Sequence, residues 1–252
     1  MQNGIVKRMV GFWQPIRILS SIALLIGATV QLRLFAQKPV SIPEEIEWTW
    51  EVLPVHPDLQ LPNVLLLGDS ITRNYFPEVT KDLAGVANVY LMASSTAVGD
   101  PRLPRQITEF ASMENVRFRV VHFNNGMHGW AYSEVQYKAG FPQLLRVLRS
   151  LVDKDGALIW ASTAPVRQDE TEGATNARVN ERNAIALKLV KAAGIVIDDQ
   201  HALMAQHGDL YQDNVHFNTA GAKIQGDQAA SLIHSALGAA HQGRPSTGPH
   251  SR

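Results

Sequence analysis

Three side chains far apart in this sequence are of the types that nucleophilic catalysis needs: Ser70, Asp213 and His216. A serine hydroxyl is a weak nucleophile until a neighbouring base takes its proton, and histidine has a suitable pKa for this near neutral pH. Asp213 stands three residues before His216, so its carboxylate could accept a hydrogen bond from the second imidazole nitrogen and fix the tautomer. Each residue taken alone also has a simpler explanation. Ser70 could serve merely to cap a helix, and His216 could be a partly buried histidine that caps the last helix.

Ser70 follows a short apolar run, Val64–Leu67, that breaks at Gly68. Such a run suits a strand buried on both faces of a parallel sheet, and the residues after it have helical signals. We therefore expect Ser70 at the carboxyl end of a strand and the amino end of a helix. The free N–H groups and the helix dipole at that position favour developing negative charge, and open α/β sheets bind their ligands at this edge.

Two further stretches accompany the Gly68-Asp69-Ser70 motif. An apolar run with a polar, glycine-containing turn spans 120–129, and Asp213-x-x-His216 precedes a new helix. In this order the three stretches resemble the SGNH hydrolases, also called GDSL esterases and lipases, and the resemblance covers about 63–237. It implies that Ser70 is the nucleophile, that His216 is its base and that Asp213 orients the base. The Gly-x-Ser-x-Gly motif of the α/β-hydrolases is absent around Ser70.

The resemblance also implies three hydrogen-bond donors for the oxyanion of a tetrahedral intermediate. The first is the backbone N–H of Ser70. The second is a glycine N–H after the second strand, for which we predict Gly99, since a glycine lets the backbone approach the substrate. A turn glycine without a catalytic task is the alternative for Gly99.

The third donor is where the sequence departs from the family pattern. The family has Gly-x-Asn-Asp, whereas this chain has Gly126-Met127-His128-Gly129. His128 falls at the place of the family's asparagine, and an imidazole can donate a hydrogen bond. Asn124 and Asn125 are the competing candidates, because a small shift of the turn could bring either amide forward.

Strand and helix patterns alternate along the chain, which predicts the α/β class with a doubly wound parallel sheet between two helical layers. The resemblance makes this a three-layer α/β/α sandwich with a five-stranded parallel sheet, the flavodoxin-like SGNH hydrolase fold. Proline is expected to interrupt the first helix near Pro77 and to bend or restart another at Pro142, and Asp153–Gly156 is predicted as a turn. The expected strands are 63–67, 86–92, 119–124, 157–161 and 195–197, and the expected helices are 71–83, 105–112, 133–153, 176–193 and 220–237.

The ends of the chain differ from this domain in composition. Residues 1–36 contain four basic and no acidic side chains, with an uncharged, largely apolar run from Ile18 to Leu32. This indicates an export signal, and hence a periplasmic or secreted protein. Arg33 behind the run leaves an uncleaved membrane anchor as the alternative. Residues 37–62 are predicted as an extended lead-in that packs against the domain, 63–238 as the SGNH hydrolase domain and 239–252 as a disordered tail.

Composition excludes several other classes. A length of 252 residues suits one sizeable domain, and 45% hydrophobic against 18% charged residues is typical of a globular protein. The part after residue 36 carries 19 basic and 23 acidic side chains, so nothing indicates a nucleic-acid partner. The chain has no cysteine, no His-x-x-x-His pair and no glycine-rich phosphate loop, so we expect no thiolate nucleophile, metal, nucleotide or other cofactor.

These observations together give one hypothesis and two rivals. The hypothesis is an exported serine esterase that removes a small acyl group, with acetyl as the first candidate, from a small-molecule or carbohydrate ester through an acyl-enzyme. The first rival is an O-acyltransferase that uses the same fold and residues. The second is a non-catalytic carbohydrate-binding domain, for which the missing Gly-x-Asn-Asp is the argument and the retained Ser70, Asp213 and His216 are the counter-argument.

Overall fold

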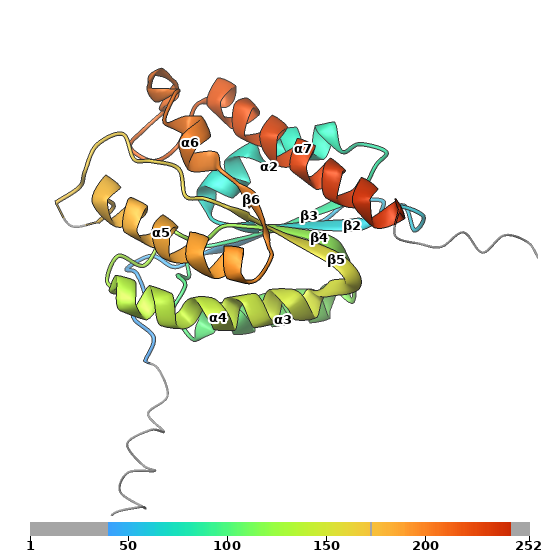
Figure 1. Cartoon of the computed structure of the whole chain (residues 1–252), viewed down its shortest axis with the longest axis horizontal. Helices are drawn as coiled ribbons and strands as arrows, with labels where there is room; N and C mark the ends of the chain where they lie inside the picture. The colour runs from blue at the N-terminus through green and yellow to red at the C-terminus, as the bar shows by residue number, and fades with distance from the viewer. Residues whose placement is uncertain (1–39, 172, 243–252) are drawn as a thin grey trace, which may run out of the picture. The chain divides into compact units, whose positions relative to one another are not determined.

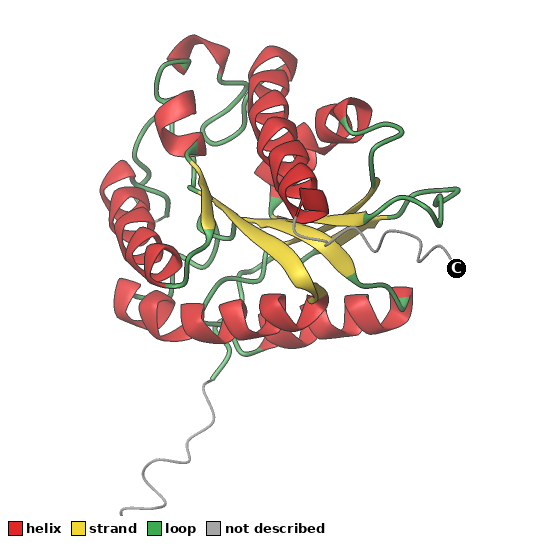
Figure 2. Ribbon diagram, turned by 45° about the vertical axis from the view of Figure 1, so that its right-hand side comes forward, coloured by secondary structure: helices red, strands yellow, loops and turns green. Residues whose placement is uncertain are grey.

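The computed structural model of the chain describes residues 40–171 and 173–242. They form one α/β unit around a six-stranded sheet with the strand order β1-β3-β2-β4-β5-β6 (Figures 1 and 2). The predicted export signal or anchor at 1–36 lies outside the described residues. Within the described part, no helix is long and apolar enough to span a membrane. The strands are β1 Thr49–Val52, β2 Asn63–Gly68, β3 Asn88–Ser94, β4 Phe118–Phe123, β5 Val152–Ala161 and β6 Val196–Asp198.

Five of the strands are parallel, and counted along the chain they have the spatial order 2-1-3-4-5 of the flavodoxin-like sheets. The strand order reverses between β2 and β4, which pair from Val64↔Val120 to Leu67↔Phe123. Ligands of such sheets bind at this switch point, beyond the carboxyl ends of the strands. The turns that follow β2 and β4 therefore occupy the place where a site is expected.

Helices cover both faces of the sheet (Figures 1 and 2). On one face α3 and α4 pack with α5 against Leu65 and Leu67 of β2, and on the other α2 and α7 pack against Val64 and Leu66. Successive side chains of a strand point to opposite faces, so a continuous apolar strand supplies both cores, as the sequence predicts. The helices are α2 Ser70–Asp82, α3 Arg102–Glu114, α4 Glu134–Leu151, α5 Asn176–Ala192, α6 Gln200–Met204 and α7 Thr219–Gln242, with a 3₁₀ turn η1 at Gly208–Leu210.

The expected five strands become six because the lead-in adds an edge strand. β1 pairs antiparallel with β3, from Thr49↔Ser94 to Val52↔Leu91. Only four residues long and largely exposed, β1 lacks the apolar pattern by which buried strands are found in a sequence. The sheet thus draws on a segment that precedes the domain boundary expected at residue 63.

The expected interruption at Pro77, the expected restart at Pro142 and the predicted turn were wrong. α2 and α4 run through Pro77 and Pro142 as single helices, because their apolar faces are buried against the sheet and this packing offsets the lost hydrogen bond. The predicted turn Asp153–Gly156 is the first half of β5. A register irregularity beside Phe118 and Val120 lets this polar stretch extend the strand at its exposed end.

A buried carboxylate ties the end of β6 to the sheet and to α7. Asp198 accepts hydrogen bonds from His122 Nε2 at 2.7 Å, Gln200 Nε2 at 3.0 Å and Gln228 Nε2 at 2.6 Å, and the side chains of Asp198 and His122 are fully buried. Burial opposes ionisation, but the hydrogen bond and charge of His122 and the two amide donors lower the pKa of Asp198.

We predict that Asp198→Asn lowers the free energy of unfolding by about 3–5 kcal/mol, because the buried charge is lost and an amide nitrogen, itself a donor, replaces one of the two accepting oxygens. Urea denaturation at pH 7 measures this, with the exposed Glu181→Gln as the matched control. A carboxylate with a lowered pKa stabilises the fold above its unfolded pKa, about 3.9, and loses this contribution as pH falls through the folded value. The difference in the free energy of unfolding between wild type and variant should therefore become smaller below about pH 4. A difference that does not change with pH would contradict this.

Candidate active site

Ser70 lies where β2 turns into α2, as the sequence predicts. β2 ends at Gly68, and Asp69 caps the helix by accepting a hydrogen bond from Ile71 N at 2.9 Å. The turn is so tight that a Cβ at position 68 would lie 2.0 Å from Thr72 Oγ1. Only glycine fits there, and the first residue of the helix presents its hydroxyl and its free N–H at the sheet edge.

The three candidate catalytic side chains form one hydrogen-bonded row. Ser70 Oγ lies 2.7 Å from His216 Nε2, and His216 Nδ1 lies 2.8 Å from Asp213 Oδ2. The other carboxylate oxygen accepts the backbone N–H groups of Val215 and His216 at 2.9 and 2.7 Å. Burial works against the charge of Asp213, but these hydrogen bonds and the imidazole lower its pKa, so the carboxylate is ionised and can orient His216.

The turn that carries Asp213 and His216 is fixed at its base. Phe217 is fully buried and stacks on Tyr211 with ring centroids 4.3 Å apart. The backbone closes around it, with Gln212 N bonded to His216 O at 2.9 Å. Asn74 of α2 donates its amide to Phe217 O at 2.7 Å, and this bond couples the histidine turn directly to the helix of the serine.

The loop after β4, which carries His128, is held by one buried cation that the sequence analysis missed. Arg182 of α5 is 1% exposed, and its guanidinium donates to the carbonyl groups of Gly126, His128, Gly129 and Tyr132 at 2.7–3.2 Å. It also lies 4.1 Å from the ring centroid of Trp130. Four inward-facing carbonyl groups in one loop leave no pattern in the sequence. Nothing in the sequence therefore connects an arginine in the middle of a helix with that loop.

His128 is bound to the lead-in segment. Its Nδ1 lies 3.0 and 3.2 Å from the two oxygens of Glu44, and Glu44 Oε1 also accepts the N–H of Gly129 at 2.7 Å. Trp48 packs edge-on against the imidazole at 5.6 Å. Among the described residues the His128 Nε2 atom has no hydrogen-bond partner. Glu44 was not among the predicted site residues, since nothing local in the sequence connects it to position 128.

Both candidate asparagines are buried and engaged within the protein. Asn124 donates its amide to Ala161 O at 2.6 Å and to Thr163 Oγ1 at 3.1 Å, which occupies both of its protons. Asn125 donates to Thr96 O at 3.0 Å and accepts the N–H of Val98 at 2.9 Å. These bonds join the loops after β4, β5 and β3.

Gly99 lies in the loop after β3 with a φ of +101°, a conformation that favours glycine. Its N–H donates no hydrogen bond to another described residue. The next residue, Asp100, accepts hydrogen bonds from Arg102, Ser41 and Tyr132. Burial opposes its charge, but these donors, Arg102 first, lower the pKa of Asp100 to about 2. A permanently charged anchor therefore holds the loop of Gly99.

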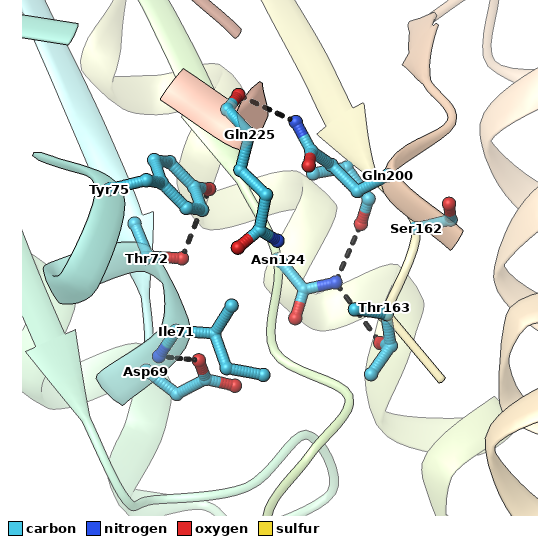
Figure 3. A pocket seen from close by; sticks show the side chains of 11 residues that line it. Asp69, Ile71, Thr72, Tyr75, Asn124, Ser162, Thr163, Gln200 and Gln225 are labelled. Atoms are coloured by element: carbon cyan, nitrogen blue, oxygen red, sulfur yellow. Dashed lines mark hydrogen bonds between the residues drawn. The ribbon is translucent and has the colours of Figure 1, made fainter. Parts of the chain in front are cut away.

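A small cavity lies beside Asp69 and Ile71, the neighbours of Ser70 in the chain (Figure 3). Its volume is about 10 Å³, room for about one water molecule, so it cannot admit an acyl group. Asp69, Tyr75 and Asn124 line it together with Gln200 and Gln225.

A scan against protein-family models finds no match, and neither does a search of curated protein sequences. Solved structures do match. An acetylxylan esterase from Geobacillus stearothermophilus has a TM-score of 0.54 at 16% identity, over 69% of this chain and 93% of that one. The C-terminal catalytic domain of peptidoglycan O-acetyltransferase A from Streptococcus pneumoniae has a TM-score of 0.55 at 21% identity, over 71% and 96%. A member of the lipolytic protein G-D-S-L family from Veillonella parvula has a TM-score of 0.55 at 16% identity, over 68% and 97%.

The chain has the SGNH hydrolase fold. This confirms the fold class predicted from the sequence, with one strand more than expected. At these identities the likeness concerns the fold alone.

We predict that Arg182→Met destabilises the protein by about 3–5 kcal/mol, because the loop carbonyls lose charged donors in a buried place. Arg182→Lys should recover only part of this, since an ammonium group cannot match the planar fork. Urea denaturation measures both. Arg146→Met on the exposed face of α4 is the control and should change stability by no more than about 0.5 kcal/mol; an equal effect at the two positions would rule out the buried arginine as the support of the loop.

Proposed function

We propose that this chain is a serine esterase of the SGNH type, which cleaves a small acyl ester through an acyl-enzyme. The observation that carries the proposal is the row of hydrogen bonds from Ser70 Oγ through His216 to Asp213, at 2.7 and 2.8 Å. A hydroxyl within 3 Å of an imidazole that is itself oriented by a carboxylate is the arrangement that activates a serine.

In the proposed reaction Ser70 Oγ attacks the ester carbonyl while its proton passes to His216 Nε2. Asp213 stabilises the resulting imidazolium. The tetrahedral intermediate places its negative oxygen among the N–H groups of Ser70 and Gly99 and the side chain of His128. When the intermediate collapses, His216 returns the proton to the leaving alcohol oxygen, and the acyl group stays on Ser70 until water repeats the sequence.

The substrate proposed is an acetyl ester, with acetylated carbohydrate as the first class to test. Two of the structural neighbours named above are an acetylxylan esterase and a peptidoglycan O-acetyltransferase domain, so acetyl transfer on sugars occurs on this fold. Export, which the basic and then apolar sequence at 1–36 suggests, would bring the enzyme to polysaccharides outside the cytoplasm. The likeness to the acetyltransferase domain keeps acyl transfer to a sugar hydroxyl as the second candidate.

We predict that the purified protein hydrolyses a chromogenic acetyl ester with a burst of product, and that Ser70→Ala lowers kcat by at least about a thousandfold. His216→Ala should be similarly inactive. Asp213→Asn should cost less than loss of the nucleophile, because the Asp213 side chain is 50% exposed. Stopped-flow absorbance gives burst and turnover, and His207→Ala is a control outside the row. Equal rates for wild type and Ser70→Ala would refute the proposal.

Hydrolysis and acyl transfer differ in the acceptor of the acyl group, which is water in the first reaction and a sugar hydroxyl in the second. For an esterase we predict that free acetate accounts for nearly all of the acyl group released, even with a soluble oligosaccharide present at millimolar concentration. Mass spectrometry of the sugar together with an acetate assay gives the partition. An acetylated sugar that appears in proportion to enzyme, and disappears in Ser70→Ala, would instead identify a transferase.

A further inference from the structure

The contact between Glu44 and His128 decides which protons the imidazole can carry. Glu44 faces Nδ1 with both carboxylate oxygens, at 3.0 and 3.2 Å. An ionised carboxylate only accepts hydrogen bonds, so Nδ1 must hold a proton in this contact. A neutral imidazole with its proton on Nδ1 has a lone pair on Nε2. That lone pair would repel an oxyanion, so His128 can donate through Nε2 only when both nitrogens are protonated.

We propose that Glu44 of the lead-in holds His128 as an imidazolium, and that its Nε2–H is a positively charged third donor of the oxyanion hole. The inference rests on the proposed function, which it deepens by assigning the residue that makes His128 fit for the role. Glu44 touches no reacting atom and acts through His128, so it is a positioning residue. A hydrogen bond with a charged donor is about twice as strong as a neutral one, and here it meets charge that forms in the transition state.

The surroundings of His128 favour the charged form. Burial disfavours it, but the hydrogen bond with Glu44 and the negative charges of Asp69, Glu44 and Glu47 raise the pKa of His128. Arg182 donates to the backbone carbonyl of His128 and lowers the pKa of Glu44. The pKa of Glu44 is lowered overall, against burial, by His128 and the Gly129 N–H, so the carboxylate stays ionised.

The position of His128 fits the role as well. It follows β4 beside the switch point, and Asn124 N at the same strand end donates to Leu67 O of β2 at 3.0 Å. Trp48 packs against the imidazole, and the guanidinium of Arg73 lies 5.8 Å from the centroid of the Trp48 ring. Arg73 belongs to α2, the helix that begins at Ser70. The Nε2 atom of His128 is left without a partner among the described residues.

The proposal sets a pH window for catalysis. His216 must be neutral to accept the proton of Ser70. His128 must be charged, so activity falls as pH rises through the elevated pKa of His128. Removal of the Glu44 charge lowers the pKa of His128 and moves this alkaline limb to lower pH.

The test compares pH profiles of kcat for the full chain and its Glu44→Gln, His128→Asn and Glu45→Gln variants. Glu44→Gln should move the alkaline limb of the kcat profile to lower pH. At pH values above the shifted limb, kcat should fall by about ten- to a hundredfold relative to wild type, with KM nearly unchanged. His128→Asn restores the neutral amide of the family pattern, so it should remain active and lose the alkaline limb. Glu45→Gln is the matched control, because Glu45 is exposed on the same segment, and its profile should equal that of wild type.

A titration of the His128 ring by NMR, in wild type and in Glu44→Gln, is independent of turnover. The proposal requires a lower pKa for His128 in the variant, and equal titration curves would overturn it. A wild-type profile without an alkaline limb, or one that Glu44→Gln does not move, would also overturn it while the esterase proposal stands. If Ser70→Ala kept wild-type turnover, the proposed function itself would fail, and the oxyanion role would fail with it.

Discussion

The hydrogen bond between Ser70 and His216 joins residues 146 positions apart, and it depends on how closely two helices pack. α2 begins at Ser70 and α7 begins just after His216, on the same face of the sheet (Figure 1). Gly226 of α7 faces α2, where a Cβ would lie 2.7 Å from the Cβ of Glu78 and 3.2 Å from Tyr75 O. A bulkier residue would push the helices apart, and a hydrogen bond that starts at 2.7 Å tolerates only a few tenths of an ångström.

The loop after β4 is positioned by a different kind of interaction. Its backbone turns several carbonyl groups inward, where apolar packing would leave them without donors. Arg182 satisfies them with a planar set of N–H groups and stacks on Trp130, while Glu134 lies 3.5 Å from its Nε atom. Burial of the guanidinium costs desolvation free energy, but its hydrogen bonds fix one conformation of a loop that has no regular secondary structure. The position of His128 depends on this loop conformation.

The fold and the triad candidates could be read from the sequence because their signals are local. Buried parallel strands are continuous apolar runs, and Gly68-Asp69-Ser70 and Asp213-x-x-His216 each fit within one turn. Glu44 and Arg182 could not be read in this way, since each acts on residues at least 50 positions away. Strand β1 was missed for a related reason: an exposed edge strand needs no apolar pattern, and only its pairing with β3 reveals it.

On our proposal, the departure from the family pattern at His128 and the unexpected pairing of the lead-in with the sheet explain each other. An amide donor has its protons whatever its surroundings, so an asparagine needs no charged partner. An imidazole donates from both nitrogens only if something holds its charge, and β1 brings the segment that contains Glu44 to the side of His128. On our proposal the lead-in is therefore part of the oxyanion hole, and a domain cut at residue 63 would keep the serine, aspartate and histidine yet lose the group that makes the third donor work.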